Sequence, residues 1–415
     1  MMGGRFPRSG VYVSLALPLL ALAAVGLMAK WWPIKTEAAA VPHLALRTSP
    51  IFVQTKPRPC VSIPEEDMSK IRAQVEPSSK AMSASLYLHA LRVFGRDSKY
   101  SRAKLATSGE TLRLFADDAF SKQILGTPLM VRTPFGIRCT PEGSAGIQES
   151  HRDYCLAVLS EQKPTASFSM VVGGKAFTLK DFLADSIANF HLGQEEIEWT
   201  ALTYAVWIPP ERKWTNKFGE VFSFDDLATE LMRRPLDKAV CAGCHVAQAM
   251  TVLARVDHEV CPILTPEVRG ELTRRLGEMV QDAEAAQSLD GSWSPDWHEK
   301  HLKDSSRDPK RKGWSEDTRS LGKRLLATSH VSEWLMLLPE EFRVSDDRFE
   351  RAGRWLHAQL KGVDSHFVGD NFCACCHGAI VLQLVRDTAG AIAVDQSREA
   401  VSVSGHQVHQ RKRVR

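Results

Sequence analysis

Three segments of this chain share one plan, and this repetition limits the possible folds more than any other feature. In each segment small residues lead to a histidine, and an apolar stretch with helical periodicity follows at once. Repeats of this kind are typical of helix pairs that stack and bury a common core. We therefore predict a mainly α-helical fold. The segments are CAGCHVAQAMTVLAR from residue 241, ATSHVSEWLMLLP from residue 327 and CACCHGAIVLQLVR from residue 373.

The first and third segments begin with C-x-x-C-H, which is the attachment pattern of c-type haem. The linkage needs two thiols at this spacing to reach both vinyl groups, and the adjacent histidine serves as an axial iron ligand. Both pentapeptides supply these groups, so haem c with a redox or electron-transfer role is the first cofactor that the sequence predicts. The predicted cofactor-binding residues are Cys241, Cys244, His245, Cys373, Cys376 and His377.

Two other interpretations of the same residues stay open. His330 has the same place in the repeat without any preceding cysteine, which suggests that the histidine is the shared element. No methionine follows His377 as a second axial ligand, and Met250 is too close to His245 on the same helix. A metal site formed by His245, His330 and His377 with the neighbouring thiols, typically for zinc, is one alternative. The other alternative is a scaffold that is stapled by disulfides and has no cofactor.

Residues 287–293 read QSLDGSW and fit the Q-x-x-D-G-S-W pattern of squalene/hopene cyclase-type repeats. The function of that loop is structural, because its glutamine and tryptophan join the end of one outer helix to the start of the next. Together with the repeated helix pairs, this loop resembles the terpenoid cyclase and protein prenyltransferase superfamily. The resemblance implies an α/α toroid of repeated helix pairs over residues 181–387.

The resemblance also implies where a site would lie. Inner helices of such toroids point their N-termini at one end of a central cavity, so His245, His330 and His377 would converge there. The partial positive charge of the helix N-termini would lower the pKa of the neighbouring thiols and favour a metal site. Such a cavity would accept a small-molecule, lipid-like or peptide ligand. The acidic D-x-D-D motif of the cyclases is missing, and Asp370 precedes Cys373 by three residues instead of the two in prenyltransferases, so neither reaction is implied.

The N-terminus predicts a membrane contact. Residues 11–29 form an uncharged apolar run, close to the roughly 20 residues that cross a bilayer. Arg5 and Arg8 precede the run and Lys30 follows it. We expect an uncleaved transmembrane anchor, with a cleavable signal peptide as the alternative. The body of the protein would then lie outside the cytoplasm, on the periplasmic or extracellular face.

Composition divides the chain into six parts. The net charge of +4 over 415 residues indicates no nucleic-acid partner. The expected parts are a short N-terminal segment (1–10), the transmembrane anchor (11–29), a linker (30–65), a helical and irregular N-terminal region (66–180), the α/α toroid (181–387) and a disordered basic tail (388–415).

Local signals predict several element boundaries. Thr265-Pro266 favours a helix start, because proline is tolerated in the first turn. A second amphipathic helix is expected after Ser345, and Gly362 would end it. Residues 170–179 favour a β-hairpin that turns at two consecutive glycines.

Glu198 and Glu333 each precede a tryptophan at matching positions of two repeats. We interpret both as capping or solvated carboxylates, with acids of a central cavity as the alternative.

Overall fold

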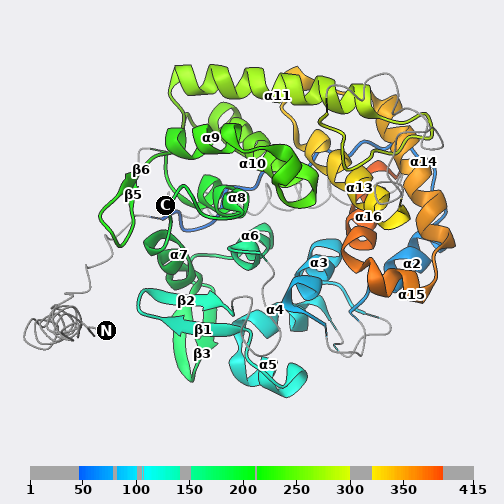
Figure 1. The fold of residues 1–415 in the computed structure, drawn as a ribbon. Coiled ribbons are helices and arrows are strands. Elements are labelled where there is room, and N and C mark those ends of the chain that lie inside the picture. The colour runs from blue at the N-terminus through cyan, green and yellow to red at the C-terminus, as the bar shows by residue number, and fades with distance from the viewer. Residues whose placement is uncertain are drawn as a thin grey trace, which may run out of the picture. The chain divides into compact units, whose positions relative to one another are not determined.

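The computed structural model describes residues 46–77, 82–100, 105, 107–140, 151–210, 213–299 and 320–386, which all belong to one unit, His43–Arg415. These residues form fourteen α-helices (Figure 1), which confirms the predicted mainly helical class. The helices are α2 (Glu65–Gln74), α3 (Ala84–Phe94), α4 (Ser108–Ala116), α5 (Asp118–Leu125), α6 (Tyr154–Glu161), α7 (Leu179–Ala188), α8 (Ile197–Trp207), α9 (Phe224–Arg233), α10 (Cys244–Arg255), α11 (Pro266–Ala286), α13 (Leu321–Leu337), α14 (Asp346–Gly362), α15 (Ser365–Asp370) and α16 (Phe372–Val385).

Several boundaries agree with the local sequence signals. α11 begins at Pro266, and α14 ends at Gly362 after its N-cap at Ser345. The hairpin predicted within 170–179 is also confirmed, since its strands pair antiparallel around two glycines with positive φ. The three antiparallel strand pairs are β1 (Met130–Thr133) with β2 (Gly136–Cys139), β3 (Ser169–Val172) with β4 (Lys175–Thr178), and β5 (Trp214–Thr215) with β6 (Val221–Phe222).

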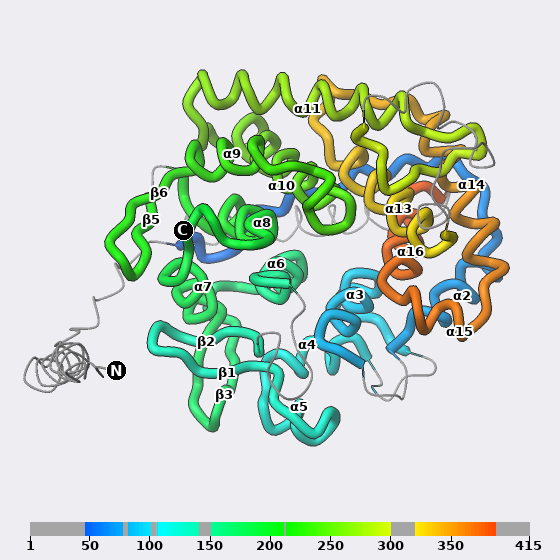
Figure 2. Tube along the Cα trace, viewed as in Figure 1, coloured from blue at the N-terminus to red at the C-terminus, as the bar shows by residue number. Residues whose placement is uncertain are grey.

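Six helices form a closed ring within this unit. α3 packs against α6, α6 against α8, α8 against α10, α10 against α13, and α13 against α16, which returns to α3. The light-blue α3 and the orange α16 therefore lie side by side although they are far apart in the sequence (Figures 1 and 2). The closure joins helices from the region 66–180 to helices from the region 181–387.

Helices that lie between the ring members in the sequence pack on the outside of the ring. α9 contacts α8 and α10, α11 contacts α9 and α10, and α14 contacts α13 and α16. The inner helix α10 is buried along nearly its whole length, whereas the outer helix α14 buries one apolar stripe and exposes a charged face. Inner and outer helices thus alternate along the chain as pairs.

All six ring helices run in the same direction, because residues from the last turn or C-cap of each helix line one cavity. Helices leave their last carbonyl groups without intrahelical partners. An extended segment, residues 46–61, crosses this end of the ring and supplies donors. The backbone N–H groups of Arg47, Lys56 and Arg58 donate to last-turn carbonyls of α8, α13 and α16 at 3.0, 3.2 and 2.8 Å. We call this segment, which the sequence placed in a linker, the strap.

Loop 287–293 has the structural role that the sequence predicts. The Gln287 side chain donates from Nε2 to the backbone oxygen of Arg348 in the first turn of α14, at 2.9 Å. The Trp293 side chain donates from Nε1 to the backbone oxygen of Ala283 in the last turn of α11, at 2.7 Å. The loop therefore joins the end of one outer helix to the start of the next.

The transmembrane anchor in the predicted fold class requires a correction. Within the described ranges, no helix has both the length and the apolar character needed to cross a bilayer. The longest of these helices, α11, has 21 residues and carries eight charged side chains. Residues 11–29, where the anchor is expected, lie outside the described residues, as does the expected tail 388–415.

Gly291 gives a test of loop 287–293. Its φ is +93°, and an added Cβ would lie 2.4 Å from the backbone oxygen of Arg351. We expect Gly291→Ala to lower the free energy of unfolding by about 2 kcal/mol, because backbone strain and overlap both increase. Gly270, exposed within α11 with nothing within 4 Å of an added Cβ, is the control. Gly270→Ala should raise the free energy of unfolding by about 0.5–1 kcal/mol. Denaturant unfolding measures both, and equal changes would contradict this description of the loop.

Candidate metal centre

A closed layer of six aromatic rings lies inside the helical ring, and each ring helix contributes one side chain. Neighbouring ring centroids are 3.8–5.2 Å apart all the way round. All six side chains are buried. We call this set the ring layer, and it confirms the predicted convergence of His245, His330 and His377. Its members are His89 of α3, Tyr154 of α6, Trp199 of α8, His245 of α10, His330 of α13 and His377 of α16.

Glu333 orients two of these histidines. Its two carboxylate oxygens lie 3.0 and 2.9 Å from Nδ1 of His377, and one of them lies 3.2 Å from Nδ1 of His330. Burial would raise the pKa of Glu333, but His377 and Arg92 outweigh that effect and hold it well below the usual value. An ionised carboxylate only accepts hydrogen bonds, so Nδ1 of each histidine donates and Nε2 keeps its lone pair. Carboxylate–histidine contacts of this kind typically fix the tautomer of metal ligands.

His89 is oriented in the same way by the backbone. Its Nδ1 lies 2.6 Å from the backbone oxygen of Ser85, one turn earlier in α3. That contact makes Nδ1 the donor and leaves the lone pair on Nε2. Nε2 in turn lies 3.0 Å from Sγ of Cys373. A third ring-layer histidine therefore presents Nε2 toward a potential ligand partner.

Three imidazole nitrogens of the ring layer have no hydrogen-bond partner in the described part of the chain. They are Nδ1 of His245, Nε2 of His330 and Nε2 of His377. A buried polar atom without a partner costs roughly 1–3 kcal/mol. Packing alone does not account for three such atoms in one layer, whereas a metal ion would satisfy their lone pairs.

The potential ligands fall into three groups, and within each group the donor atoms lie within 4.8 Å of one another. The groups are Cys241, His245 and His330; His89, Cys373 and His377; and His330, Glu333 and His377. The first two groups have the same chemistry, since each joins a Cys-x-x-x-His pair to a histidine from another helix. Glu333 links these two groups through its contacts with His330 and His377.

The two pentapeptides reach the site with different backbones. Cys241, Ala242 and Gly243 have φ values of 51°, 55° and 74°, and α10 begins only at Cys244. The second pentapeptide is helical throughout, because α16 begins at Phe372. Non-glycine residues in the left-handed region cost roughly 1–2 kcal/mol each. Strain of this kind concentrates at functional sites, and here it occurs where Cys241 joins a ligand group.

The second cysteine of each pentapeptide, Cys244 or Cys376, belongs to none of the ligand groups. The four cysteines of the two C-x-x-C pairs are free thiols. Covalent haem needs both cysteines of a motif on one macrocycle and a histidine that faces its iron. Here the rings of His245 and His377 instead face the ring of His330, with centroids 4.5 and 3.8 Å away. The His330 ring thus lies next to both histidines, and the donor atoms around it are close enough together to hold a metal ion.

The thiols differ from the expectation that helix N-termini lower their pKa. Burial raises the pKa of Cys373 to about 12 and the pKa of Cys241 well above its ordinary value. Desolvation therefore outweighs the helix N-terminus at both positions. Burial also lowers the pKa of His377 to about 3, and it lowers the pKa values of His89 and His245 well below the ordinary value. In the metal-free site these three imidazoles are therefore neutral and these two thiols are protonated.

Sequence reasoning missed His89 and gave Glu333 a place in a central cavity only as the alternative. His89 lies in the stretch SASLYLHALRVFG, where no cysteine accompanies it and an isolated histidine in an apolar helix was the only signal. The interpretation of Glu198 and Glu333 as solvated carboxylates is wrong, because these residues are buried, with only 2% and 5% of their surface exposed. Of these two, only Glu333 belongs to a ligand group.

No protein-family model, no curated protein and no solved structure matches this chain. The resemblance to terpenoid cyclases and prenyltransferases therefore stays a prediction, and the site itself has to indicate the function.

The lowered histidine pKa values predict the acid stability of the metal-free protein. His89, His245 and His377 are neutral when folded and take up protons on unfolding below pH 6.5, so stability falls as the pH falls from 6.5 toward 3. Each histidine lowers the free energy of unfolding by about 1.4 kcal/mol per pH unit, so the three together lower it by about 4 kcal/mol per pH unit. Ionised Glu333 adds to the loss at the acid end of this range. Denaturant unfolding of chelator-treated protein between pH 7 and 5 measures the slope.

His377→Gln should reduce that slope by about one third, because one of the three protons is then no longer taken up. His366→Gln is the matched control, since the His366 side chain is 86% exposed. A stability that does not change between pH 7 and 5 would contradict the neutral state of the buried histidines.

Proposed function

We propose that this chain is a metalloprotein that binds two zinc-type divalent ions in the ring layer. The observation that supports it most is the set of three buried imidazole nitrogens without partners, close to two thiols and a carboxylate. The proposed ligands are Cys241, His245 and His330 for one ion and His89, Cys373 and His377 for the other.

The donor chemistry favours zinc or a similar transition metal. Imidazole nitrogen and thiolate sulfur are the usual zinc ligands, whereas magnesium and calcium prefer oxygen. Each proposed group supplies three protein donors, so a tetrahedral ion would keep one position open, as in catalytic zinc sites. A bound zinc ion would supply Lewis-acid chemistry and acidify a water molecule in that position. Glu333 would hold His330 and His377 in the tautomer that both ions require.

Metal content tests the proposal. Protein produced in the presence of zinc should contain two zinc ions per chain when measured by plasma mass spectrometry. Cys241→Ser and Cys373→Ser should each reduce the content to about one, because each removes the thiolate of one group. Cys375→Ser is the control and should keep two ions, since Cys375 is buried in the same pentapeptide as Cys373 but belongs to no ligand group. Wild-type protein without metal would refute the proposal, and a single ion that survives both variants would refute the two-site assignment.

Covalent haem c is the second candidate, and the two C-x-x-C-H pentapeptides favour it. The intact mass of denatured, reduced protein that was made with the c-type maturation machinery separates the candidates. We expect an unshifted mass, because Cys244 and Cys376 lie outside the ligand groups. A mass increase by one or two haems that disappears in Cys244→Ala and Cys376→Ala would favour haem over zinc. The same two variants should leave the zinc content unchanged if the metal proposal is right.

A further inference from the structure

The interior of the helical ring continues past the ring layer into a cavity at the C-terminal end of the six helices. Its volume is about 380 Å³, which falls in the range of small-molecule sites, roughly 300–1,000 Å³. Arg92, Gln248 and Ile380 line this cavity, and each follows a ring-layer histidine by three residues on its own helix. Since one helical turn rises about 5.4 Å, the cavity begins about one turn beyond the proposed metal ligands.

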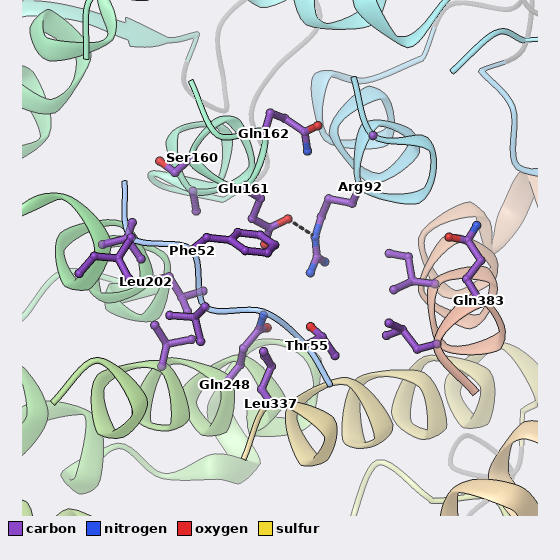
Figure 3. Close-up of a pocket in the computed structure, with 18 residues that line it drawn as sticks. Phe52, Thr55, Arg92, Ser160, Glu161, Gln162, Leu202, Gln248, Leu337 and Gln383 are labelled. Carbon is purple, nitrogen blue, oxygen red and sulfur yellow. Dashed lines mark hydrogen bonds and ion pairs between the residues drawn. The ribbon is translucent and has the colours of Figure 1, made fainter. Parts of the chain in front are cut away.

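The walls of the cavity are mainly apolar. The strap forms one wall, and the side chain of Phe52 projects from it into the space between the helices (Figure 3). The polar side chains that line it are Thr55, Ser160, Gln162, Gln248, Gln383 and one ion pair between Arg92 and Glu161. A largely apolar wall with a few placed polar groups is typical of sites for small organic molecules.

The guanidinium group of Arg92 lines this cavity, and among the described residues only its Nε has a hydrogen-bond partner. Its Nε donates to Glu161 at 2.8 Å, and the two side chains approach each other from α3 and α6 (Figure 3). The Arg92 side chain is only 9% exposed. Its Nη1 is buried and has no hydrogen-bond partner among the residues that the structure describes. A guanidinium group has no acceptor atoms, so a partner for its remaining N–H groups has to be an acceptor.

The charges around the cavity decide which kind of acceptor fits. The carboxylate of Glu161 already compensates the charge of Arg92. Six helix C-termini point at this end of the ring, and each carries partial negative charge. Glu333 adds a further carboxylate near Arg92. An anionic ligand would meet this negative potential, whereas a neutral carbonyl oxygen would accept a hydrogen bond from the Arg92 guanidinium group without that cost.

We propose that this cavity binds a small, neutral and mainly apolar molecule through one carbonyl-type oxygen that accepts a hydrogen bond from the guanidinium group of Arg92. The cavity holds the apolar body of the molecule against α8, α10 and the strap. This site goes beyond the proposed metal function, because binding of the molecule does not itself require a metal ion.

Two nine-carbon probes test the site by calorimetric titration into the full chain. We expect 2-nonanone to bind one molecule per chain, and nonanoate to bind at least about tenfold more weakly at pH 7, because its charge is not compensated. The titrations use both zinc-loaded and chelator-treated protein. Because binding of the ketone does not require a metal ion, the result for the cavity does not depend on whether the metal proposal holds. Absence of 2-nonanone binding, or tighter binding of nonanoate, would overturn the proposal.

Three variants locate the probe. Arg92→Leu combined with Glu161→Leu removes the ion pair as a unit, which avoids an unpaired buried charge, and should weaken 2-nonanone binding by about tenfold. Val252→Phe, which leaves the ion pair intact and fills part of the cavity, should abolish binding. Leu289→Ala, at a side chain that is 75% exposed and outside the cavity, is the control and should bind as the wild type does. Thermal unfolding verifies that each variant is folded. Wild-type affinity in both cavity variants would refute the location.

Discussion

The contact between six planar side chains, one from each ring helix, is the constraint on which the rest of the structure depends. Each aromatic side chain contacts its two neighbours in the layer. The six helices therefore have to place these side chains at the same height along their common direction. Once that height is set, helical geometry places the next residues of every helix one turn further on. The ring layer therefore also determines which side chains line the cavity beyond it. A register shift in any one helix would remove its side chain from the layer.

The four histidines of this layer are energetically unfavourable without a ligand. Four imidazoles are buried, three of their nitrogens lack partners in the described residues, and the nearby thiols are held protonated. A metal ion would turn these unfavourable features into ligand bonds, and it would connect α3, α10, α13 and α16 across the ring. Because the ligands come from four helices, the free energy of metal binding would also be free energy of folding. The zinc-loaded protein is therefore expected to be the more stable form.

The two ends of the helical ring have different chemistry because the six helices are parallel. The cysteine-containing pentapeptides lie at or near the N-termini of α10 and α16, whereas the last carbonyls of the ring helices face the strap. The strap satisfies some of these carbonyls and at the same time forms one wall of the cavity. The ion pair between Arg92 and Glu161 adds a polar anchor to an otherwise apolar space. The ring layer and the cavity are thus successive layers of one arrangement of helices.

The sequence by itself determined the features that depend on short-range interactions. Helical class, the start of α11 at Pro266, the end of α14 at Gly362 and the β3–β4 hairpin follow from periodicity, capping and glycine turns, which act over a few residues. The tertiary structure decided which groups meet. His89 joins the site from a helix without any motif, and α13 begins at Leu321, so His330 is not at a helix start as its repeat suggested. The thiol pKa values rise where local reasoning predicts a fall, because desolvation depends on all the helices that surround a residue. Side chains from distant helices meet only after the ring closes, and no local pattern records that closure.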